Sequence, residues 1–398
     1  MLELRHMKDF FEKTVIAGLL GISVFPFLTY AATFKYAAWL PFWKKQSGAI
    51  EIALNLEKFQ EISPFSYEVR ADGTLIDDLK IDQGFWPGWL GAARDMKIKI
   101  IPTIAWLYGD QSYKLLSNTT LRRKHEDNIA ALIVGKRFDG VDIDYEDKPS
   151  AAKQYFSLLL KGLALRLHPK GKILSCTIEA RTPADSMYPS DASSTVHQYA
   201  NDYVAINKYC DEVRIMAYDQ GSIDLNLNAK KGNGAFYMPV ADPDWVKKVL
   251  DLATKTIGRK KIMLGIPTYG YQYEVSWVNG VTTYKRLRAM SFGQAMDLAD
   301  ALGTAPLRNS AGELSLTYAT STAVNVSAGL TYQVNSTSAP PLFTTSSVSA
   351  IPVTRYVSFS DTSAIADKIK LAKQYKLRGV VFFKMDGETD PGIWEEMK

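Results

Sequence analysis

Apolar residues alternate with polar ones in several short runs of the chain, and stretches with helical spacing separate these runs. Residues 98–106, 173–180 and 261–270 each have the pattern of a β-strand. Between them, residues 121–134 and 151–167 repeat apolar side chains every three or four positions, as amphipathic helices do. Strands that alternate with helices predict an α/β fold with a parallel sheet.

The same pattern predicts further strands before and after these runs. Together the expected strands are residues 35–43, 59–67, 98–106, 139–146, 173–180, 212–219, 261–270 and 378–383. A helix is expected over residues 362–375. A chain of 398 residues is about the right length for a (β/α)8 barrel with an insertion.

The expected strand at residues 139–146 has an unusual polar face. Alternation places Val141, Ile143 and Tyr145 on one face and Asp142, Asp144 and Glu146 on the other. An exposed strand face is one interpretation, but Asp is depleted in strands and like charges about 7 Å apart repel one another. The alternative is a barrel strand whose interior face carries catalytic carboxylates, with Glu146 at the carboxyl end, where barrel enzymes hold their active sites.

Three motifs give the chain a resemblance to family 18 glycoside hydrolases, the chitinase-like enzymes. The acids from Asp139 to Glu146 match the family signature D-x-x-D-x-D-x-E. Residues 216–219 are similar to its M-x-Y-D, and residues 265–270 to its G-x-P-x-Y-G. The resemblance covers roughly residues 35–398 and implies a TIM barrel without a cofactor.

By this resemblance the four acids have separate roles. Glu146 would protonate the leaving oxygen, while the acetamido oxygen of the sugar attacks its own anomeric carbon. Asp144 would hydrogen-bond the acetamido nitrogen and share a proton with Asp142. Crowded carboxyls cannot all ionise cheaply, so the pKa of Glu146 should be raised. Asp139 has the opposite strand parity and is expected to give structural support.

Other residues are expected to bind the sugar. Tyr218 would donate to the acetamido oxygen, and the remaining substrate-binding candidates are Asp219, Met216, Phe383, Trp39 and Tyr269. For Trp39, Trp43 and Tyr269, packing in the core is the competing interpretation. At the position of Phe383, relatives usually have a tryptophan, which forms the floor on which the sugar stacks. A shift of one residue in the strand register would instead turn Phe382 or Lys384 inwards.

The family pattern also implies an α+β insertion between strands seven and eight. Residues 271–352 change to short alternating segments with Ser/Thr-rich stretches, and a helix is expected at 291–302. Alternating apolar residues at 314–318 and 330–334 disfavour the other interpretation, a flexible linker. The catalytic domain is thus predicted to cover residues 33–398.

Residues 1–32 have the order of an export signal: basic residues, an apolar run, then small residues before Ala32. A cleaved signal peptide implies a secreted or cell-envelope protein, an uncleaved membrane anchor would tether it, and a buried helix is the third option. The net charge of +5 is modest, and basic residues do not interleave with aromatics as they do in nucleic-acid-binding proteins. No obligate protein partner is indicated.

The cysteines and histidines do not indicate a metal site, because they lack ligand spacing. Cys176 and Cys210 lie in apolar runs, so buried thiols are favoured over a disulfide. The charged stretch 122–127, which contains His125, is interpreted as a solvated helix face.

The favoured function is hydrolysis of β-1,4 bonds next to N-acetylglucosamine in chitin or its oligomers. Two alternatives stay open. The first is a peptidoglycan N-acetylglucosaminidase, because residues 355–384 are similar to spore and cell-wall members of the family. The second is a non-catalytic chitinase-like lectin, which the presence of Glu146 disfavours.

Overall fold

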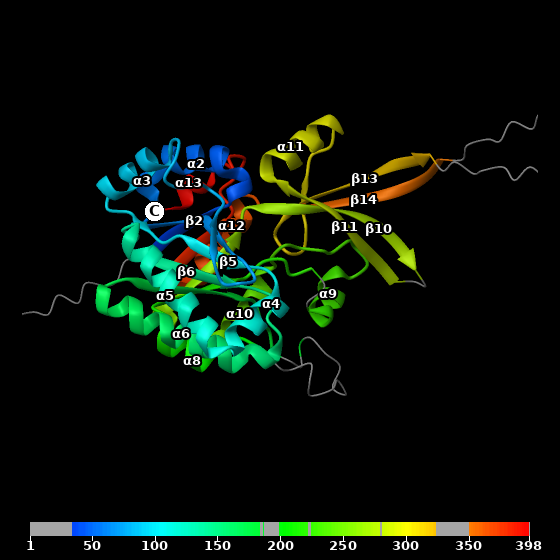
Figure 1. Ribbon diagram of the computed structural model, residues 1–398. Helices are drawn as coiled ribbons and strands as arrows, with labels where there is room; N and C mark the ends of the chain where they lie inside the picture. The colour runs from blue at the N-terminus through cyan, green and yellow to red at the C-terminus, as the bar shows by residue number, and fades with distance from the viewer. Residues whose placement is uncertain are drawn as a thin grey trace, which may run out of the picture. The chain divides into compact units, whose positions relative to one another are not determined.

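The computed structural model describes residues 34–183, 186, 199–221, 224–278, 281–323 and 350–397. Figure 1 shows helices wrapped around a central sheet, with a second sheet beside them. No helix in these ranges combines the length and the apolar character needed to cross a membrane. The predicted export signal or anchor at residues 1–32 lies outside the described residues.

Eight parallel strands close into a barrel, as predicted. In chain order they are β1 (Lys35–Leu40), β2 (Glu61–Val69), β4 (Lys99–Ile100) with β5 (Thr103–Trp106), β6 (Gly140–Tyr145), β7 (Ile173–Glu179), β8 (Glu212–Met216), β9 (Ile262–Pro267) and β15 (Gly379–Phe383). β1 pairs with both β2 and β15, and this pairing closes the ring. The third strand is interrupted at Pro102, which has no amide hydrogen to give to a neighbouring strand.

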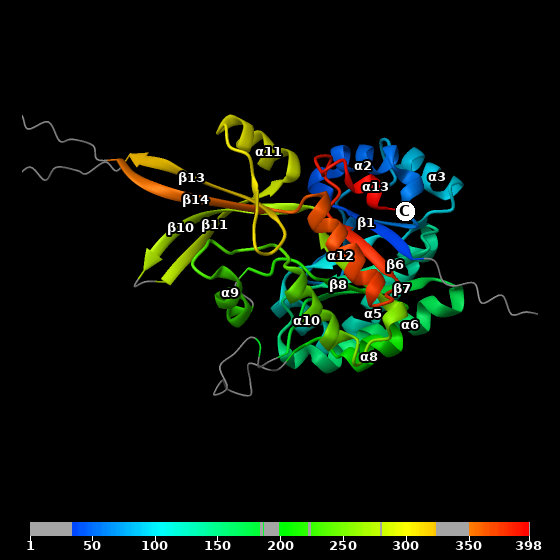
Figure 2. The ribbon, with the colours of Figure 1, turned by 180° about the vertical axis from the view of Figure 1, so that it is seen from behind.

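Helices cover the outside of the barrel (Figure 2). They are α2 (Lys45–Leu54), α3 (Trp86–Asp95), α4 (Gly109–Ser117), α5 (Thr119–Gly135), α6 (Lys153–Leu167), α8 (Tyr203–Tyr209), α10 (Pro243–Ala253), α12 (Thr362–Gln374) and α13 (Ile393–Glu396). A further helix, α9 (Leu225–Gly232), lies away from the barrel, below the second sheet in Figures 1 and 2. Side chains fix where these helices begin: Asn118 accepts from the amides of Thr120 and Leu121 at the start of α5. Buried apolar side chains of α5, α6, α10 and α12 form one cluster with those of the barrel strands, so the core lies between the two layers.

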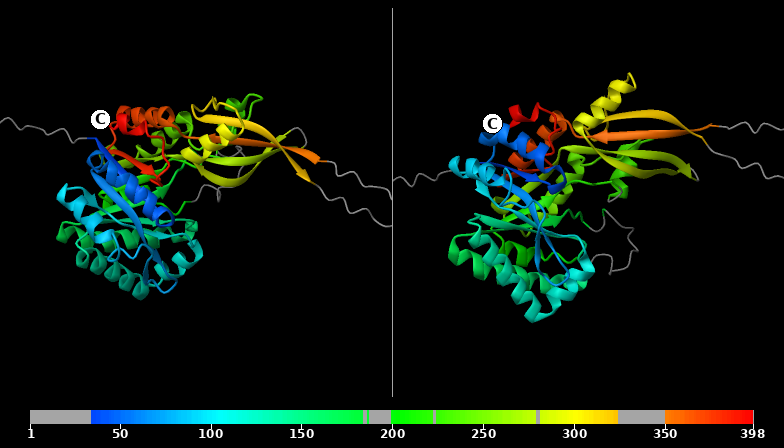
Figure 3. Two further views of the ribbon diagram at one scale, coloured as in Figure 1. Left: turned by 90° about the horizontal axis from the view of Figure 1, so that it is seen from above. Right: turned by 45° about the horizontal axis from the view of Figure 1, so that its top comes forward.

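An antiparallel sheet with one helix is inserted between β9 and β15. It consists of β10 (Tyr269–Val278), β11 (Val281–Ser291), β12 (Leu307–Arg308), β13 (Leu314–Ala323), β14 (Ala350–Phe359) and α11 (Phe292–Ala301). Figure 3 shows the long hairpin of β10 and β11, which the sequence pattern did not reveal. The sheet begins before and ends after the expected range of 271–352, and the segment 330–334 lies outside the described residues.

The first and sixth barrel strands end earlier than predicted. β1 stops at Leu40, and Phe42–Lys44 form a short 3-10 helix, which leaves the side chains of Phe42 and Trp43 exposed. β8 stops at Met216, before Tyr218 and Asp219. In both cases, the residues that follow the end of the strand form the rim of the barrel.

The prediction that residues 122–127 form a solvated face is wrong for three of the six residues, while Arg123, Lys124 and Asp127 are exposed. Arg122, His125 and Glu126 are buried on α5. The ring of His125 bridges the carbonyl oxygen of Gly73 at 2.7 Å and the hydroxyl of Tyr145 at 2.5 Å. Burial lowers the pKa of His125 to about 4, so the ring is neutral. Because of its charged residue types, the sequence did not indicate that this face of α5 packs against the loop before β3 (Leu75–Asp77).

The preference for buried thiols is also wrong, because Cys176 and Cys210 form a disulfide. Cys176 lies within β7, and Cys210 directly precedes the neighbouring strand β8. Pairing of the two strands brings their Cα atoms to 6.1 Å, within the range that a disulfide spans. Strand pairing between distant segments supplies this contact, and the apolar context of each cysteine could not show it.

Candidate active site

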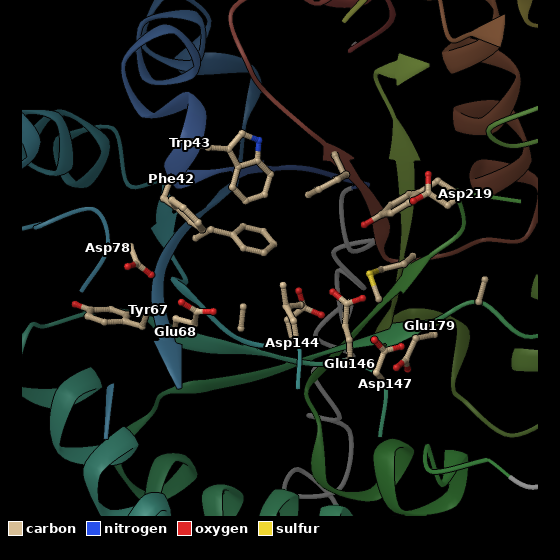
Figure 4. Close-up of a pocket in the computed structure, with 17 residues that line it drawn as sticks. Phe42, Trp43, Tyr67, Glu68, Asp78, Asp144, Glu146, Asp147, Glu179 and Asp219 are labelled. Atoms are coloured by element: carbon tan, nitrogen blue, oxygen red, sulfur yellow. The ribbon is translucent and has the colours of Figure 1, made fainter. Parts of the chain in front are cut away.

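A cleft of about 550 Å³ opens at the carboxyl ends of the barrel strands (Figure 4). Its polar lining is acidic and consists of Glu68, Asp78, Asp144, Glu146, Asp147, Glu179 and Asp219 with Tyr67 and Tyr218. Its apolar lining is Phe42, Trp43, Phe65, Ala105, Leu107, Ala180, Met216 and Phe383. The structure therefore brings most of the predicted site residues together in one cavity.

Asp142 lies below the cleft and is fully buried. Its two carboxylate oxygens accept hydrogen bonds from Trp39 Nε1 at 3.0 Å, Thr103 Oγ1 at 3.0 Å, Ser175 Oγ at 2.8 Å and Thr177 Oγ1 at 2.8 Å. Four donors from β1 and from the two neighbouring strands, β5 and β7, match the number of hydrogen bonds that a carboxylate can accept. The alternation of β6 directs Asp142 to this position, as predicted.

A buried arginine completes the surroundings of Asp142. The Nη1 atom of Arg214 lies 3.6 Å from Asp142 Oδ2, and its Nη2 lies 3.5 Å from Glu61 Oε2 and 3.4 Å from Glu212 Oε1. Burial, with the negative charge of Glu61, raises the pKa of Glu212 to about 7. The sequence analysis did not single out these charges, because an arginine inside a strand pattern gives no sign of facing the barrel interior.

Asp144 is the next acid on the same face, and its surroundings differ. It lines the cleft with only 2% of its surface exposed, and its Oδ1 has no hydrogen-bond partner in the part of the chain that the structure describes. Burial is the main cause that raises the pKa of Asp144 well above its usual range, and the charges of Glu146 and Asp142 add to it. Burial therefore favours the protonated form of Asp144, and its Oδ1 faces the cleft without a partner among the described residues.

Glu146 follows the last residue of β6 and also lines the cleft. Burial, followed by the negative charge of Glu179, raises the pKa of Glu146 to about 7. Lys148 acts in the opposite direction. A carboxyl with a pKa near neutrality can both give and take a proton, as general acid–base catalysis requires.

Two tyrosines orient Asp219 on the opposite wall. Tyr269 Oη donates to Asp219 Oδ1 at 2.5 Å, and Tyr271 Oη donates to the same oxygen at 2.9 Å. Asp219 has φ of 56°, in the left-handed region that a non-glycine residue rarely adopts. Tyr218 lines the cleft next to Asp219.

Phe383 forms the floor of the cleft and belongs to an aromatic cluster. Its ring stacks on Tyr218 at a centroid distance of 5.2 Å and meets the edges of Trp39 and Tyr269. Phe382, by contrast, is fully buried and stacks on Tyr36. The register of β15 thus directs Phe383, and not Phe382, to the cleft.

Trp39 and Tyr269 do not line this cleft, although both were candidates for sugar contact. Trp39 has no exposed surface and Tyr269 has 2%, because each lies beneath the floor and donates to an acid, Asp142 or Asp219. The core alternative describes their positions better. Asp139 lies apart from the cleft and accepts from the amide of Ile100 at 2.8 Å, which agrees with its expected support.

The exposed aromatic on the cleft wall is Trp43, with 52% of its surface accessible, and Phe42 lies next to it. The sequence analysis considered Trp39 and Trp43 together, as residues that contact sugar or pack in the core. Which of the two reaches the cleft depends on where β1 ends. Glu68 and Asp78 line the far end of the cavity (Figure 4). Nothing in their local sequence separates these two acids from ordinary surface carboxylates.

Comparison with known proteins agrees with this geometry. The family Glycosyl hydrolases family 18 matches residues 88–388. The uncharacterized glycosylase YvbX of Bacillus subtilis is 23% identical over 73% of this chain and 69% of its own length. Probable chitinase 2 of Drosophila melanogaster is 26% identical over 71% of this chain and 54% of its own.

Two solved structures have the same fold. The spore cortex-lytic enzyme SleL of Bacillus megaterium superposes with a TM-score of 0.65 at 20% identity, covering 92% of this chain and 73% of that one. A chitinase of Chromobacterium violaceum gives a TM-score of 0.65 at 19% identity, covering 92% of this chain and 98% of that one. These likenesses support the barrel with its insertion.

Proposed function

Because the chain belongs to the glycosyl hydrolases of family 18, we propose that it is a retaining, substrate-assisted hydrolase of β-1,4 bonds next to N-acetylglucosamine, in chitin or its oligomers. The observation that carries this proposal is the pair formed by Asp144 and Glu146. Both acids line one cleft, one buried with an unused oxygen and the other with a pKa raised to about 7.

In the first step the acetamido oxygen of the bound sugar attacks the anomeric carbon, and the bond to the leaving oxygen breaks. Glu146 gives its proton to that oxygen. The free Oδ1 of Asp144 accepts the acetamido N–H, and Tyr218 donates its hydroxyl to the acetamido oxygen. The proton attributed to the two aspartates rests on Asp144, since Asp142 already accepts from four side chains.

In the second step, ionised Glu146 takes a proton from water, which attacks the oxazolinium from the side that the leaving group vacated. The product keeps its β configuration. The ring of Phe383 supports the distorted sugar, because stacking on an aromatic face stabilises it during bond cleavage. Trp43 and Phe42 provide a further apolar surface for the neighbouring sugar.

A peptidoglycan N-acetylglucosaminidase is the second candidate. The fold similarity to an enzyme described as spore cortex-lytic favours it, as does the match to the putative sporulation-specific glycosylase YdhD of Bacillus subtilis, which is 22% identical over 84% of this chain. In both candidate reactions, the sugar on the Asp144 side of the broken bond is N-acetylglucosamine. They differ in the leaving sugar.

Product analysis tests the proposal. Chitin oligomers and purified peptidoglycan are digested side by side, and mass spectrometry identifies the fragments. Proton NMR of the first turnovers should show the β-anomer, and β-1,4-glucose oligomers without an acetamido group should stay intact. Release of the α-anomer, or cleavage of the glucose oligomers, would contradict substrate assistance; the absence of any cleavage would favour a lectin.

We also propose that residues 1–32 direct export to the outside of the cell or to its envelope, on the charge and apolar order of that segment. N-terminal sequencing of exported protein should find a start near Ala32. An intact Met1 in the membrane fraction would support the anchor instead.

A further inference from the structure

A small side pocket opens next to the cleft and is not used by the mechanism above. It has a volume of about 150 Å³ and is lined by Lys148, Arg181, Asn201 and Tyr203. Glu179 and Ala180 line both this pocket and the cleft, so the two cavities adjoin. A group attached to a sugar in the cleft can reach the pocket past these two residues.

Lys148 is the first sign that the pocket receives a ligand. Its side chain is fully buried, and its ammonium lies 4.7 Å from the centre of the Phe156 ring and 3.6 Å from Glu179 Oε1. The Nζ atom has no hydrogen-bond partner among the residues that the structure describes. A buried ammonium with three unused donors is costly, so an acceptor that enters the pocket would stabilise it.

Arg181 adds a second cation at the mouth of the pocket. Its guanidinium carbon lies 4.1 Å from the centre of the Tyr203 ring and 4.2 Å from that of Tyr199, so two aromatic faces fix its plane. A guanidinium stacked on aromatic rings can still donate from its edge to a carboxylate. The single acid of the pocket, Glu179, already accepts from Asn201 Nδ2, so two cations face one engaged carboxylate.

The position of the pocket identifies which sugar would carry the ligand group. Figure 4 shows Asp144, Glu146 and Glu179 following one another across the cleft. In the proposed mechanism Asp144 holds the sugar that is attacked, and Glu146 protonates the oxygen that leaves. Glu179 lies beyond Glu146, so the side pocket faces the leaving sugar.

Resting on the proposed function, we propose that Lys148 and Arg181 form a subsite for a carboxylate on the leaving sugar. A sugar of the muramic acid type has such a group, a lactyl ether at O3, whereas a chitin residue has none. The carboxylate would satisfy the donors of Lys148 and pair with Arg181. Of the two candidate substrates above, the subsite therefore favours the second, a glycan in which N-acetylglucosamine precedes an acidic amino sugar.

Three substrates test the subsite: chitopentaose, a peptide-free glycan of alternating N-acetylglucosamine and N-acetylmuramic acid, and the methyl ester of that glycan. The parent enzyme should prefer the free acid to the ester in kcat/KM by about tenfold or more, the factor expected of one charge-assisted hydrogen bond. Arg181→Gln should remove this preference and leave chitopentaose turnover unchanged. Arg181→Lys should restore part of it.

Lys153→Met is the matched control, since it removes a cation that is 54% exposed and lies 3.9 Å from Asp202, outside the pocket. It should keep the preference for the acid. Equal turnover of acid and ester by the parent would overturn the subsite. So would an equal loss on chitopentaose in Arg181→Gln, because the pocket would then hold a neutral group.

Calorimetric titration of the same glycans into the Glu146→Gln variant separates the subsite from the reaction. Tighter binding of the acid than of the ester supports the pocket even where the parent cleaves neither glycan, an outcome that would reject only the proposed function. Equal binding of acid and ester rejects the pocket alone. Thermal melting of each Arg181 variant checks that the fold is intact.

Discussion

The two ends of the acidic strand β6 differ in how far their carboxyl groups are satisfied. At the inner end, Asp142 accepts from four side chains and lies beside Arg214. At the cleft end, Asp144 has an oxygen without a partner in the described part of the chain, and burial raises the pKa values of Asp144 and Glu146. The residue types are the same, and only the surroundings differ.

This difference assigns separate work to the two ends. A carboxylate whose lone pairs are all used cannot bind substrate, but it fixes the strands that meet around it. A carboxyl that is buried and unsatisfied is unfavourable in the empty protein and becomes favourable when a ligand pairs with it. The inner end is therefore suited to maintaining the shape of the site, and the cleft end to the chemistry that we propose.

Glu146→Gln should cause the largest change. The substitution removes the proton donor at nearly constant shape, so kcat should fall by about 10²- to 10⁴-fold, the usual contribution of general acid catalysis. Steady-state kinetics on chitin oligomers measures the loss, and oligosaccharide binding by calorimetry should stay nearly unchanged. Glu57→Gln, an exposed acid outside the cleft, is the control. Activity of Glu146→Gln within tenfold of the parent would reject this residue as the acid.

A pair of isosteric changes sharpens the contrast between the two ends. Asp142→Asn leaves Arg214 short of one charge and reverses one acceptor into a donor, so the free energy of unfolding should drop by about 3 kcal/mol. Asp144→Asn should leave stability nearly unchanged while kcat falls strongly, because burial disfavours the charged form of Asp144 and its Oδ1 has no hydrogen bond to lose among the described residues. Urea unfolding of both variants measures the two changes in the free energy of unfolding. Equal losses of stability would show that the two ends are not distinct.

The sequence could predict the strand face of these acids but not their environments. Strict alternation, a chain length that suits a barrel, and the three motifs are enough to predict the eight-stranded barrel. They are also enough to predict that Asp144, Glu146 and Tyr218 lie in one cleft. The donors around Asp142 come from β1, β5 and β7, and Arg214 comes from β8. Their meeting point depends on strand register and barrel closure, which local spacing does not contain.

Phe383→Ala tests the floor of the cleft end. The ring lies at the cleft surface, so its loss should lower kcat/KM about tenfold through weaker stacking of the sugar, with little loss of stability. Phe383→Trp offers a larger face and should preserve or raise activity. Phe382→Ala is the contrasting variant, because that side chain is fully buried and its removal should cost about 3 to 5 kcal/mol of stability. The reverse pattern would show that the assigned register is wrong.

The sequence analysis was wrong at several residues for the same reason, because local spacing does not contain contacts between distant segments. Trp39 and Trp43 have the same type and neighbouring positions, yet the end of β1 at Leu40 places one in the core and the other on the cleft. His125 lies in a stretch with a solvated pattern, but its ring bonds to Gly73 in a distant loop. Cys176 and Cys210 meet only because β7 and β8 pair. In each case a contact between distant segments overrides the local pattern.

The smallest expected effect concerns the pH profile at the cleft end. Glu146 must be protonated to act, so kcat/KM should fall as the pH rises through its pKa of about 7. Glu179 raises this pKa and Lys148 lowers it. Glu179→Gln should therefore move the alkaline limb to lower pH, because the carboxylate of Glu146 loses a repulsive neighbour, and Lys148→Met should move it to higher pH. Glu68→Gln, at the far end of the cleft, should move it less than either. Shifts of the same sign in the Glu179 and Lys148 variants would show that distant charge, and not these two neighbours, controls the acid.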